Sequence, residues 1–182
     1  MKIRFRKPNP PLYTVFPGVL VVMMAVLWVG AVSTPRAQGE PAAEDVATGL
    51  RIYRQKADCQ ACHGWAADGR KMDSQMPDGA NLRATKLDRA KLIVAIKCGI
   101  PGKGMPAFDR LAYSDGRCYG MKQADLKKLG AMPDPAATLQ PREIEQVADF
   151  LFAKVVGKGP MNRAACIEFW GSDVEACKEF PN

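Results

Sequence analysis

The stretch CQACHGW contains two cysteines and the only histidine of the 182-residue chain. Cys59, Cys62 and His63 have the C-x-x-C-H spacing, in which two thiols three residues apart can form thioether bonds with the vinyl groups on one edge of a haem. The histidine that follows is then placed to bind the iron from the same short turn. The spacing predicts one covalently attached haem c, with Cys59 and Cys62 as attachment sites and His63 as the proximal iron ligand.

Other uses of the cysteine pair fit the sequence less well. A redox site of the thioredoxin type would lie in a βαβ unit, and the chain shows no sustained strand pattern. A zinc site would need further cysteines or histidines at ligand spacing, and there is no second C-x-x-C and no second histidine. A chance match in an exported chain is the third alternative, and the surrounding features favour haem attachment over it.

A low-spin haem in an electron carrier needs a second axial ligand, and no other histidine of this chain can supply it. Among the nine methionines, Met105 in PGKGMPAF is the leading candidate for the distal iron ligand. Pro106 disfavours helical backbone at Met105, and two neighbouring glycines let the backbone approach a flat ligand closely. Met76 and Met121 are the alternatives, together with a sixth position that stays open.

Residues 1–37 have the pattern of an export signal. Their five basic residues are accompanied by no acid, and the stretch Val19–Val32 carries no charge. The mostly apolar run is about 19 residues long, enough to span a bilayer. We expect either a cleaved signal peptide or a retained membrane anchor through residues 14–32. Both place the remaining chain in the periplasm, soluble or tethered to the outer face of the inner membrane.

The net charge of +7 resides largely in that first segment. The rest of the chain has 21 basic and 19 acidic residues, which is close to balance. A nucleic-acid-binding domain would need a basic patch on its folded surface, so no nucleic-acid partner is expected.

The periodicity of apolar residues predicts an all-α chain with long loops between the helices. Stretches without periodicity, rich in Gly, Pro, Asp and Asn, follow the cysteine motif over residues 64–83 and contain Met105, and they are expected to be loops. Helices are predicted over residues 42–56, 87–99 and 141–157, with a short one over residues 122–129 and two short amphipathic pieces in the tail.

Taken together, CQACHG, IKCGIPGKGMP and the helix EIEQVADFL resemble a bacterial, exported, mono-haem class I c-type cytochrome over residues 44–157. The resemblance implies a class I cytochrome c fold, in which helices wrap around one haem. It also implies that the first and last helices cross at Gly49 and Phe150. A loop carbonyl is expected to accept a hydrogen bond from Nδ1 of His63, with Pro77 as the candidate. Trp65 is expected to pack at the haem edge or to cover the mouth of its pocket.

The chain departs from a compact member of that family in two places. Residues 109–140 are longer than a compact member requires and are expected to be an insertion within a cytochrome domain over residues 38–157. Residues 158–182 are expected to be a C-terminal extension.

Four cysteines lie outside the motif, and cysteines of an exported chain are expected to be oxidised. Sequence proximity favours a Cys98–Cys118 disulfide around Met105 and a Cys166–Cys177 disulfide that staples the extension. Buried free thiols are the alternative.

These features predict an extracytoplasmic one-electron carrier rather than an enzyme. It would shuttle electrons through a haem ligated by His63 and Met105 from a periplasmic dehydrogenase or another donor to a respiratory complex or oxidase. A fixed haem subunit of a larger oxidoreductase is the first alternative. An enzyme or gas sensor with an open sixth iron position is the second.

Overall fold

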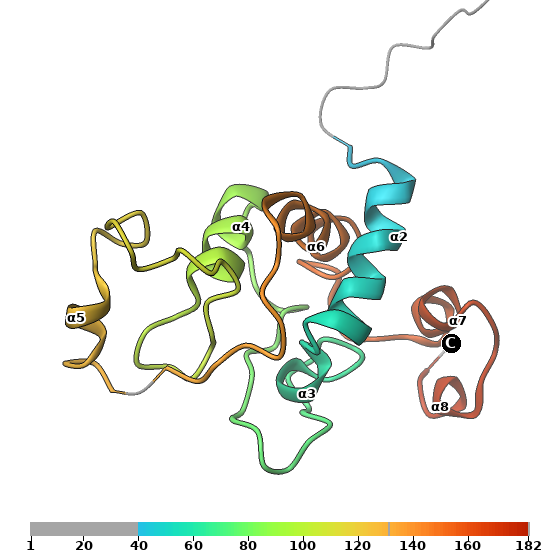
Figure 1. The fold of residues 1–182 in the computed structure, drawn as a ribbon. Coiled ribbons are helices and arrows are strands. Elements are labelled where there is room, and N and C mark those ends of the chain that lie inside the picture. The colour runs from blue at the N-terminus through green and yellow to red at the C-terminus, as the bar shows by residue number, and fades with distance from the viewer. Residues whose placement is uncertain (1–39, 131, 182) are drawn as a thin grey trace, which may run out of the picture. The chain divides into compact units, whose positions relative to one another are not determined.

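The structure is a computed structural model that describes residues 40–130 and 132–181. All regular elements in that part of the chain are helices, which confirms the predicted all-α class (Figure 1). The predicted export segment lies outside the described residues. The elements in chain order are α2 (Ala43–Arg51), the π-helical turn η1 (Ile52–Lys56), α3 (Gln60–His63), α4 (Arg89–Cys98), α5 (Gln123–Leu126), α6 (Pro141–Lys154), α7 (Arg163–Trp170) and α8 (Glu175–Lys178).

The first and last long helices of the predicted cytochrome domain, α2 and α6, cross at Gly49. A Cβ atom at this position would overlap the carbonyl of Gln146 and contact the side chain of Phe150, so only glycine permits this approach. One turn further on, the ring of Tyr53 packs 5.6 Å from that of Phe150. The predicted crossing of Gly49 with Phe150 is therefore confirmed.

The third long helix, α4, packs on α6 through its buried residues Leu92 and Ile96. The side chain of Asp88 caps its first turn by accepting the N–H of Lys91 at 2.8 Å. Arg89 donates at 2.5 Å to the nearly buried carboxylate of Asp149 on α6. The apolar side chains of α2, α4 and α6 form one core, and the ion pair of Arg89 with Asp149 adds a polar contact between α4 and α6.

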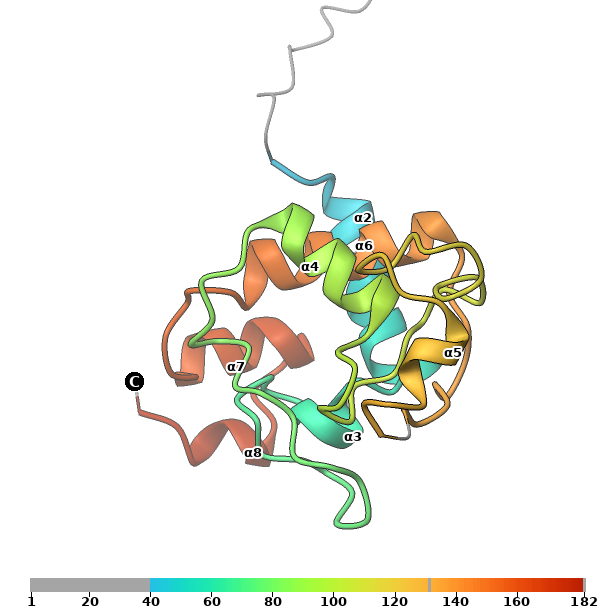
Figure 2. The ribbon, with the colours of Figure 1, turned by 90° about the vertical axis from the view of Figure 1, so that its left-hand side faces the viewer.

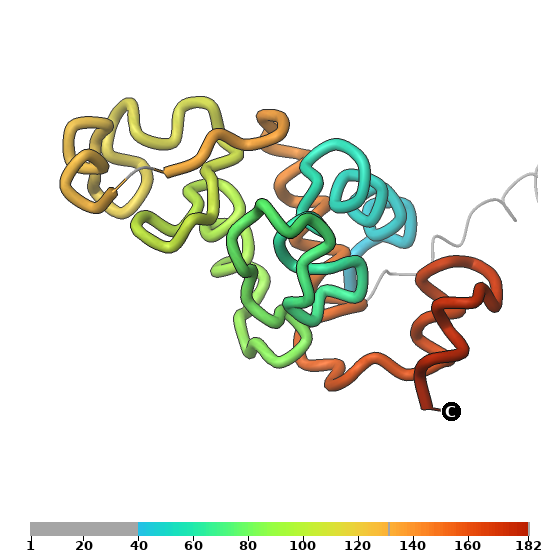
Figure 3. The backbone as a smooth tube through the Cα atoms, turned by 90° about the horizontal axis from the view of Figure 1, so that it is seen from below, coloured from blue at the N-terminus to red at the C-terminus, as the bar shows by residue number. Residues whose placement is uncertain are grey.

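Residues 109–130 and 132–140, with α5, lie on one side of that core, and the tail, with α7 and α8, lies on the other (Figure 1 and Figure 2). The tube view shows the same separation (Figure 3). The structure pairs Cys98 with Cys118 and Cys166 with Cys177, the two pairs that sequence proximity favours.

The tail packs against Trp65, directly after the cysteine motif. The indole ring lies 5.5 Å from Phe169, 5.5 Å from Trp170 and 5.7 Å from Phe180. Arg54 stacks on the opposite end of this cluster, with its guanidinium carbon 4.3 Å above the ring of Trp170. The expectation that Trp65 lies at the haem edge or pocket mouth is wrong, because the half-buried indole packs in the aromatic cluster of the extension and does not line the cavity beside His63.

Candidate functional site

A cavity of about 470 Å³ lies between α3 and the loop that contains Met105. Cys62 and His63 line it from α3, Cys59 lines it from the N-cap of that helix, and Met105 lines it from the loop. The structure therefore brings together all four residues that the sequence singled out. The remaining wall is largely apolar and includes Phe108, together with residues of the loop that precedes Ala80.

Short hydrogen bonds hold the turn that carries the cysteines and the histidine. The N–H of His63 donates to the carbonyl of Cys59 at 2.9 Å, and the N–H of Cys59 donates to that of Tyr53 at 2.9 Å. Gly64 ends the turn with φ of 76°, a conformation that glycine adopts without strain. The buried hydroxyl of Tyr53 then donates to the carbonyl of Gly64 at 2.7 Å. The orientation of α3 is thus tied to η1 and to the core beneath it.

The imidazole of His63 is oriented by a loop carbonyl, as the resemblance implies, but from a different residue. Its Nδ1 lies 2.8 Å from the carbonyl oxygen of Ala80, so Pro77 is the wrong candidate. The reason is a backbone hydrogen bond from Gly79 N–H to the Cys62 carbonyl, at 3.1 Å, which brings the end of the loop rather than its start against the ring.

With Nδ1 donating to that carbonyl, Nε2 of His63 keeps its lone pair for a metal. Burial lowers the pKa of His63, while the hydrogen bond with Ala80 opposes that shift. Burial prevails, so the pKa is lowered and the neutral imidazole is favoured, while the hydrogen bond defines its tautomer. This is the form in which histidine binds iron, and a backbone partner of this kind is the usual support for such a ligand.

Gly79 is a second close approach in the same place. A Cβ atom there would lie 2.7 Å from Nδ1 of His63 and 2.7 Å from the carbonyl oxygen of Cys62. Any larger residue would therefore push on the imidazole or on the turn that carries the cysteines. The backbone at Gly79 therefore lies in close contact with the imidazole of His63.

The thiols of the motif are poorly suited to thiolate chemistry. Burial, followed by the negative charge of Asp58, raises the pKa of Cys59 to about 12. Burial and Asp58 also raise the pKa of Cys62. Reactive cysteines of redox motifs have lowered pKa values, so these environments argue against a thioredoxin-like site.

The Met105 loop is a tight backbone structure. The N–H of Ile100 donates to the carbonyl of Met105 at 3.1 Å, and the N–H of Lys103 donates to the carbonyl of Ile100 at 3.0 Å. Gly102 and Gly104 have φ of 74° and 78°, which explains why two glycines precede the methionine. The loop thus presents a half-buried Met105 side chain at the cavity wall.

The two alternative methionines occupy different surroundings. Met76 also lines the cavity, but its side chain is largely exposed on the loop before Pro77. Met121 is not among the lining residues, because it packs with Cys98 and Cys118 in a separate apolar cluster. Of the two, only Met76 remains a competitor of Met105 for a ligand bound in the cavity.

The cavity and its donors fit a haem c. Two sulfurs three residues apart, an imidazole with its Nδ1 engaged and a thioether from a second segment all reach one apolar space. The absence of a side chain at Gly79 lets the loop backbone approach Nδ1 of His63 closely. A haem c bound here would be attached through Cys59 and Cys62 and would take the imidazole nitrogen of His63 and the sulfur of Met105 as ligands, and it would supply one-electron chemistry.

Comparison with known proteins agrees with this fit. Residues 44–123 match the family model described as "Cytochrome C oxidase, cbb3-type, subunit III". The matched range includes the cysteine motif, the Ala80 loop and Met105. No curated protein and no solved structure matches the chain significantly. Residues 44–123 therefore form a c-type cytochrome domain, whose family binds haem c covalently and uses it for electron transfer.

Proposed function

We propose that the chain is an extracytoplasmic one-electron carrier whose haem c is attached through Cys59 and Cys62 and ligated by His63 and Met105. The observation that carries the proposal is the convergence of these four side chains on one apolar cavity. When bound, haem c supplies one-electron chemistry through its ferric and ferrous states.

The chain's own residues determine what kind of haem site this is. His63, held by the Ala80 carbonyl, offers a basic nitrogen, and Met105 offers a soft thioether that favours ferrous iron and raises the reduction potential relative to a second histidine. A filled sixth position leaves no coordination site for a substrate. The proposal therefore favours electron transfer over an enzyme or gas sensor with an open position.

Donor and acceptor are proposed to be redox proteins, such as a periplasmic dehydrogenase and a respiratory oxidase. The family description names an oxidase subunit, which supports an oxidase as one partner and keeps a fixed haem subunit as the second candidate function. Among the described residues, no helix is long and apolar enough to cross a bilayer. The proposed anchor through residues 14–32 lies outside them, and so does the alternative cleavable signal.

A redox titration of the purified holoprotein with carbon monoxide present and absent tests the carrier. The proposal predicts a single one-electron wave, low-spin spectra in both oxidation states and no effect of carbon monoxide. Rapid binding of carbon monoxide to the reduced protein would instead indicate an open sixth position on the iron. Size-exclusion chromatography of a native membrane and periplasmic extract separates the shuttle, which elutes as a free monomer, from a subunit, which elutes in a large complex.

A further inference from the structure

The end of α4 leads directly into the Met105 loop and is held by residues that follow that loop. The last carbonyls of a helix have no partner inside it. Here the carbonyl of Ile96 accepts the N–H of Phe108 at 3.2 Å, and that of Lys97 accepts the N–H of Asp109 at 3.1 Å. Backbone hydrogen bonds therefore join the segment that enters the Met105 loop to the segment that leaves it.

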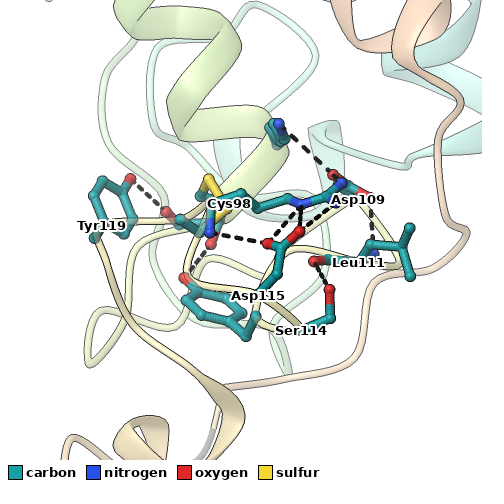
Figure 4. The surroundings of a disulfide bond; sticks show 11 residues. Cys98, Asp109, Leu111, Ser114, Asp115 and Tyr119 are labelled. Atoms are coloured by element: carbon teal, nitrogen blue, oxygen red, sulfur yellow. Dashed lines mark hydrogen bonds and ion pairs between the residues drawn. A yellow bond between two sulfur atoms is a disulfide. The ribbon is translucent and has the colours of Figure 1, made fainter.

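The next two carbonyls are bound by tyrosine hydroxyls instead of by backbone. Tyr113 donates to the carbonyl of Cys98 at 2.5 Å from a buried position. Tyr119 donates to the carbonyl of Gly99 at 2.9 Å, and its ring points toward the end of α4 (Figure 4). Burial raises the pKa of both tyrosines, so both hydroxyls remain protonated donors at neutral pH.

Further constraints keep the two tyrosines in place. The Cys98–Cys118 disulfide joins the end of α4 to the residue before Tyr119. Tyr119 itself has φ of 57°, an unfavourable conformation for a residue with a side chain, in a turn closed by Met121 N–H donating to Cys118 at 3.0 Å. Such strain persists only where the surrounding structure enforces it. The surrounding structure therefore holds Tyr119 in an unfavourable backbone conformation, in which its hydroxyl donates to the carbonyl of Gly99.

A displacement of Gly99 must also displace Met105. The two residues are in close backbone contact, since a Cβ atom on Gly99 would lie 2.5 Å from the carbonyl oxygen of Met105 and 2.6 Å from the carbonyl carbon of Pro106. The Ile100–Met105 hydrogen bond closes the loop immediately beyond this contact. The position of the Gly99 carbonyl is thus transmitted to Met105 through the backbone alone.

We infer that Tyr113 and Tyr119 are positioning residues for Met105, which hold the start of its loop so that the thioether stays directed into the cavity and competing ligands stay out. The inference rests on the proposed ligation by His63 and Met105. Neither tyrosine contacts the cavity, so both act through the backbone of Cys98 and Gly99.

Imidazole binding to the ferric holoprotein tests this claim, with the long-wavelength sulfur-to-iron band as a second readout. Each of Tyr113→Phe and Tyr119→Phe is expected to raise the affinity for imidazole about fivefold, because the loss of one hydrogen bond eases opening of the loop. Arg83→Met is the control. It removes an equally short side-chain-to-carbonyl hydrogen bond, from Nε of Arg83 to Gly159 at 2.6 Å, at a residue that does not line the cavity.

The control is expected to lower the free energy of unfolding while leaving the imidazole affinity unchanged. An equal rise in all three variants would overturn the inference, since it would reflect general destabilisation. Unchanged imidazole affinity in both Tyr113→Phe and Tyr119→Phe would also overturn the inference. Tyr119 is 51% exposed, so Tyr119→Phe tests the claim even where Tyr113→Phe fails to fold.

Hydrogen exchange of the Ile100 and Lys103 amides separates a failure of this inference from a failure of the proposed function. Both amides donate within the Met105 loop and report its opening whatever binds the iron. Faster exchange of these amides in Tyr119→Phe but not in Arg83→Met supports the positioning role of Tyr119 even if the wild-type protein lacks the sulfur-to-iron band. If these amides exchange at the wild-type rate in Tyr119→Phe while the protein shows the sulfur-to-iron band, the positioning role is rejected and the proposed ligation by Met105 stands.

Discussion

Nδ1 of His63 lies 2.8 Å from the carbonyl oxygen of Ala80, and the glycine before Ala80 lies flat against the same ring. The loop therefore supplies both the hydrogen bond that orients the imidazole and the space in which it sits. Because a hydrogen bond of this kind increases the basicity of a metal-bound imidazole, it also influences the reduction potential.

Gly79→Ala is expected to lower haem attachment and shift the reduction potential of any holoprotein formed. The added Cβ would meet Nδ1 of His63 and the carbonyl of Cys62, both at 2.7 Å, and one of them must move. The measurement is the haem content and midpoint potential of the purified variant. Gly49→Ala is the matched control, because its clash lies at the helix crossing. It should lower the melting temperature without moving the potential, and a Gly79→Ala protein with unaltered potential would contradict the account.

Removal of the Cys98–Cys118 disulfide is expected to destabilise the protein and loosen the Met105 loop. The bridge joins residues separated by 20 positions. In the chain-entropy description, a loop of this size contributes about 3 kcal/mol to the free energy of unfolding. Denaturant unfolding of Cys98→Ala/Cys118→Ala measures the loss. Cys166→Ala/Cys177→Ala is the control, with a similar loss but no change in imidazole affinity. Unreduced peptide mapping checks the pairing, and a Cys118–Cys166 peptide would refute it.

Trp65→Ala is expected to destabilise the junction between the cytochrome domain and the tail. Trp65 is half-buried and packs beside three aromatic rings of the extension, so its loss is expected to cost less than the roughly 3–5 kcal/mol of a fully buried tryptophan. Thermal unfolding monitored by circular dichroism measures the effect, and Trp65→Phe should recover part of it. Since Trp65 is not a lining residue of the haem cavity, the visible spectrum of folded Trp65→Ala should match the wild type. A changed spectrum would place the indole nearer the haem than the structure does.

Glu143 is expected to make the stability of the helix α6 depend on pH. Its carboxylate binds Lys56 and the N–H of Gln140, and these contacts lower its pKa from the ordinary value near 4.5. A lowered pKa means that the stabilisation is complete above 4.5 and is lost as the pH falls through the folded value.

Glu143→Gln should therefore lower the free energy of unfolding at neutral pH, by about 1 kcal/mol or less for a partly exposed pair. The difference from wild type should shrink in acid. Denaturant titrations between neutral pH and pH values well below 4.5 measure it. Glu175→Gln removes an exposed ion pair with Lys178 on α8. Its free energy of unfolding should be almost the same as that of the wild type at both neutral and acid pH. A difference for Glu143→Gln that grows in acid would contradict the assigned contacts.

The sequence predicted what depends on short-range spacing. Helices α2, α4 and α6 follow from apolar periodicity and from residues such as Gly99 and Pro141 at their ends. The convergence of His63 and Met105 was predicted because each lies in a motif with few structural solutions. The crossing at Gly49 came from the family resemblance.

Contacts to backbone carbonyls could not be predicted in the same way. Any of several carbonyls in the loop before Leu82 could have reached His63, and the choice of Ala80 depends on how Gly79 pairs with Cys62. The roles of Tyr113 and Tyr119 have no sequence signature, since their acceptors are main-chain atoms of a helix end. Both tyrosines lie in a segment without helical periodicity, so the sequence gives no signal of their contacts until the fold is known.

The most direct test of the central claim is the sulfur-to-iron absorption band of the oxidised protein, measured in wild type, Met105→Ala and Met76→Ala. Met76 is the matched control, because it lines the same cavity from the other loop. The account predicts that Met105→Ala loses the band and has a lower reduction potential, whereas Met76→Ala keeps both. A Met105→Ala protein that retains the band at the wild-type potential would show that Met105 is not the ligand.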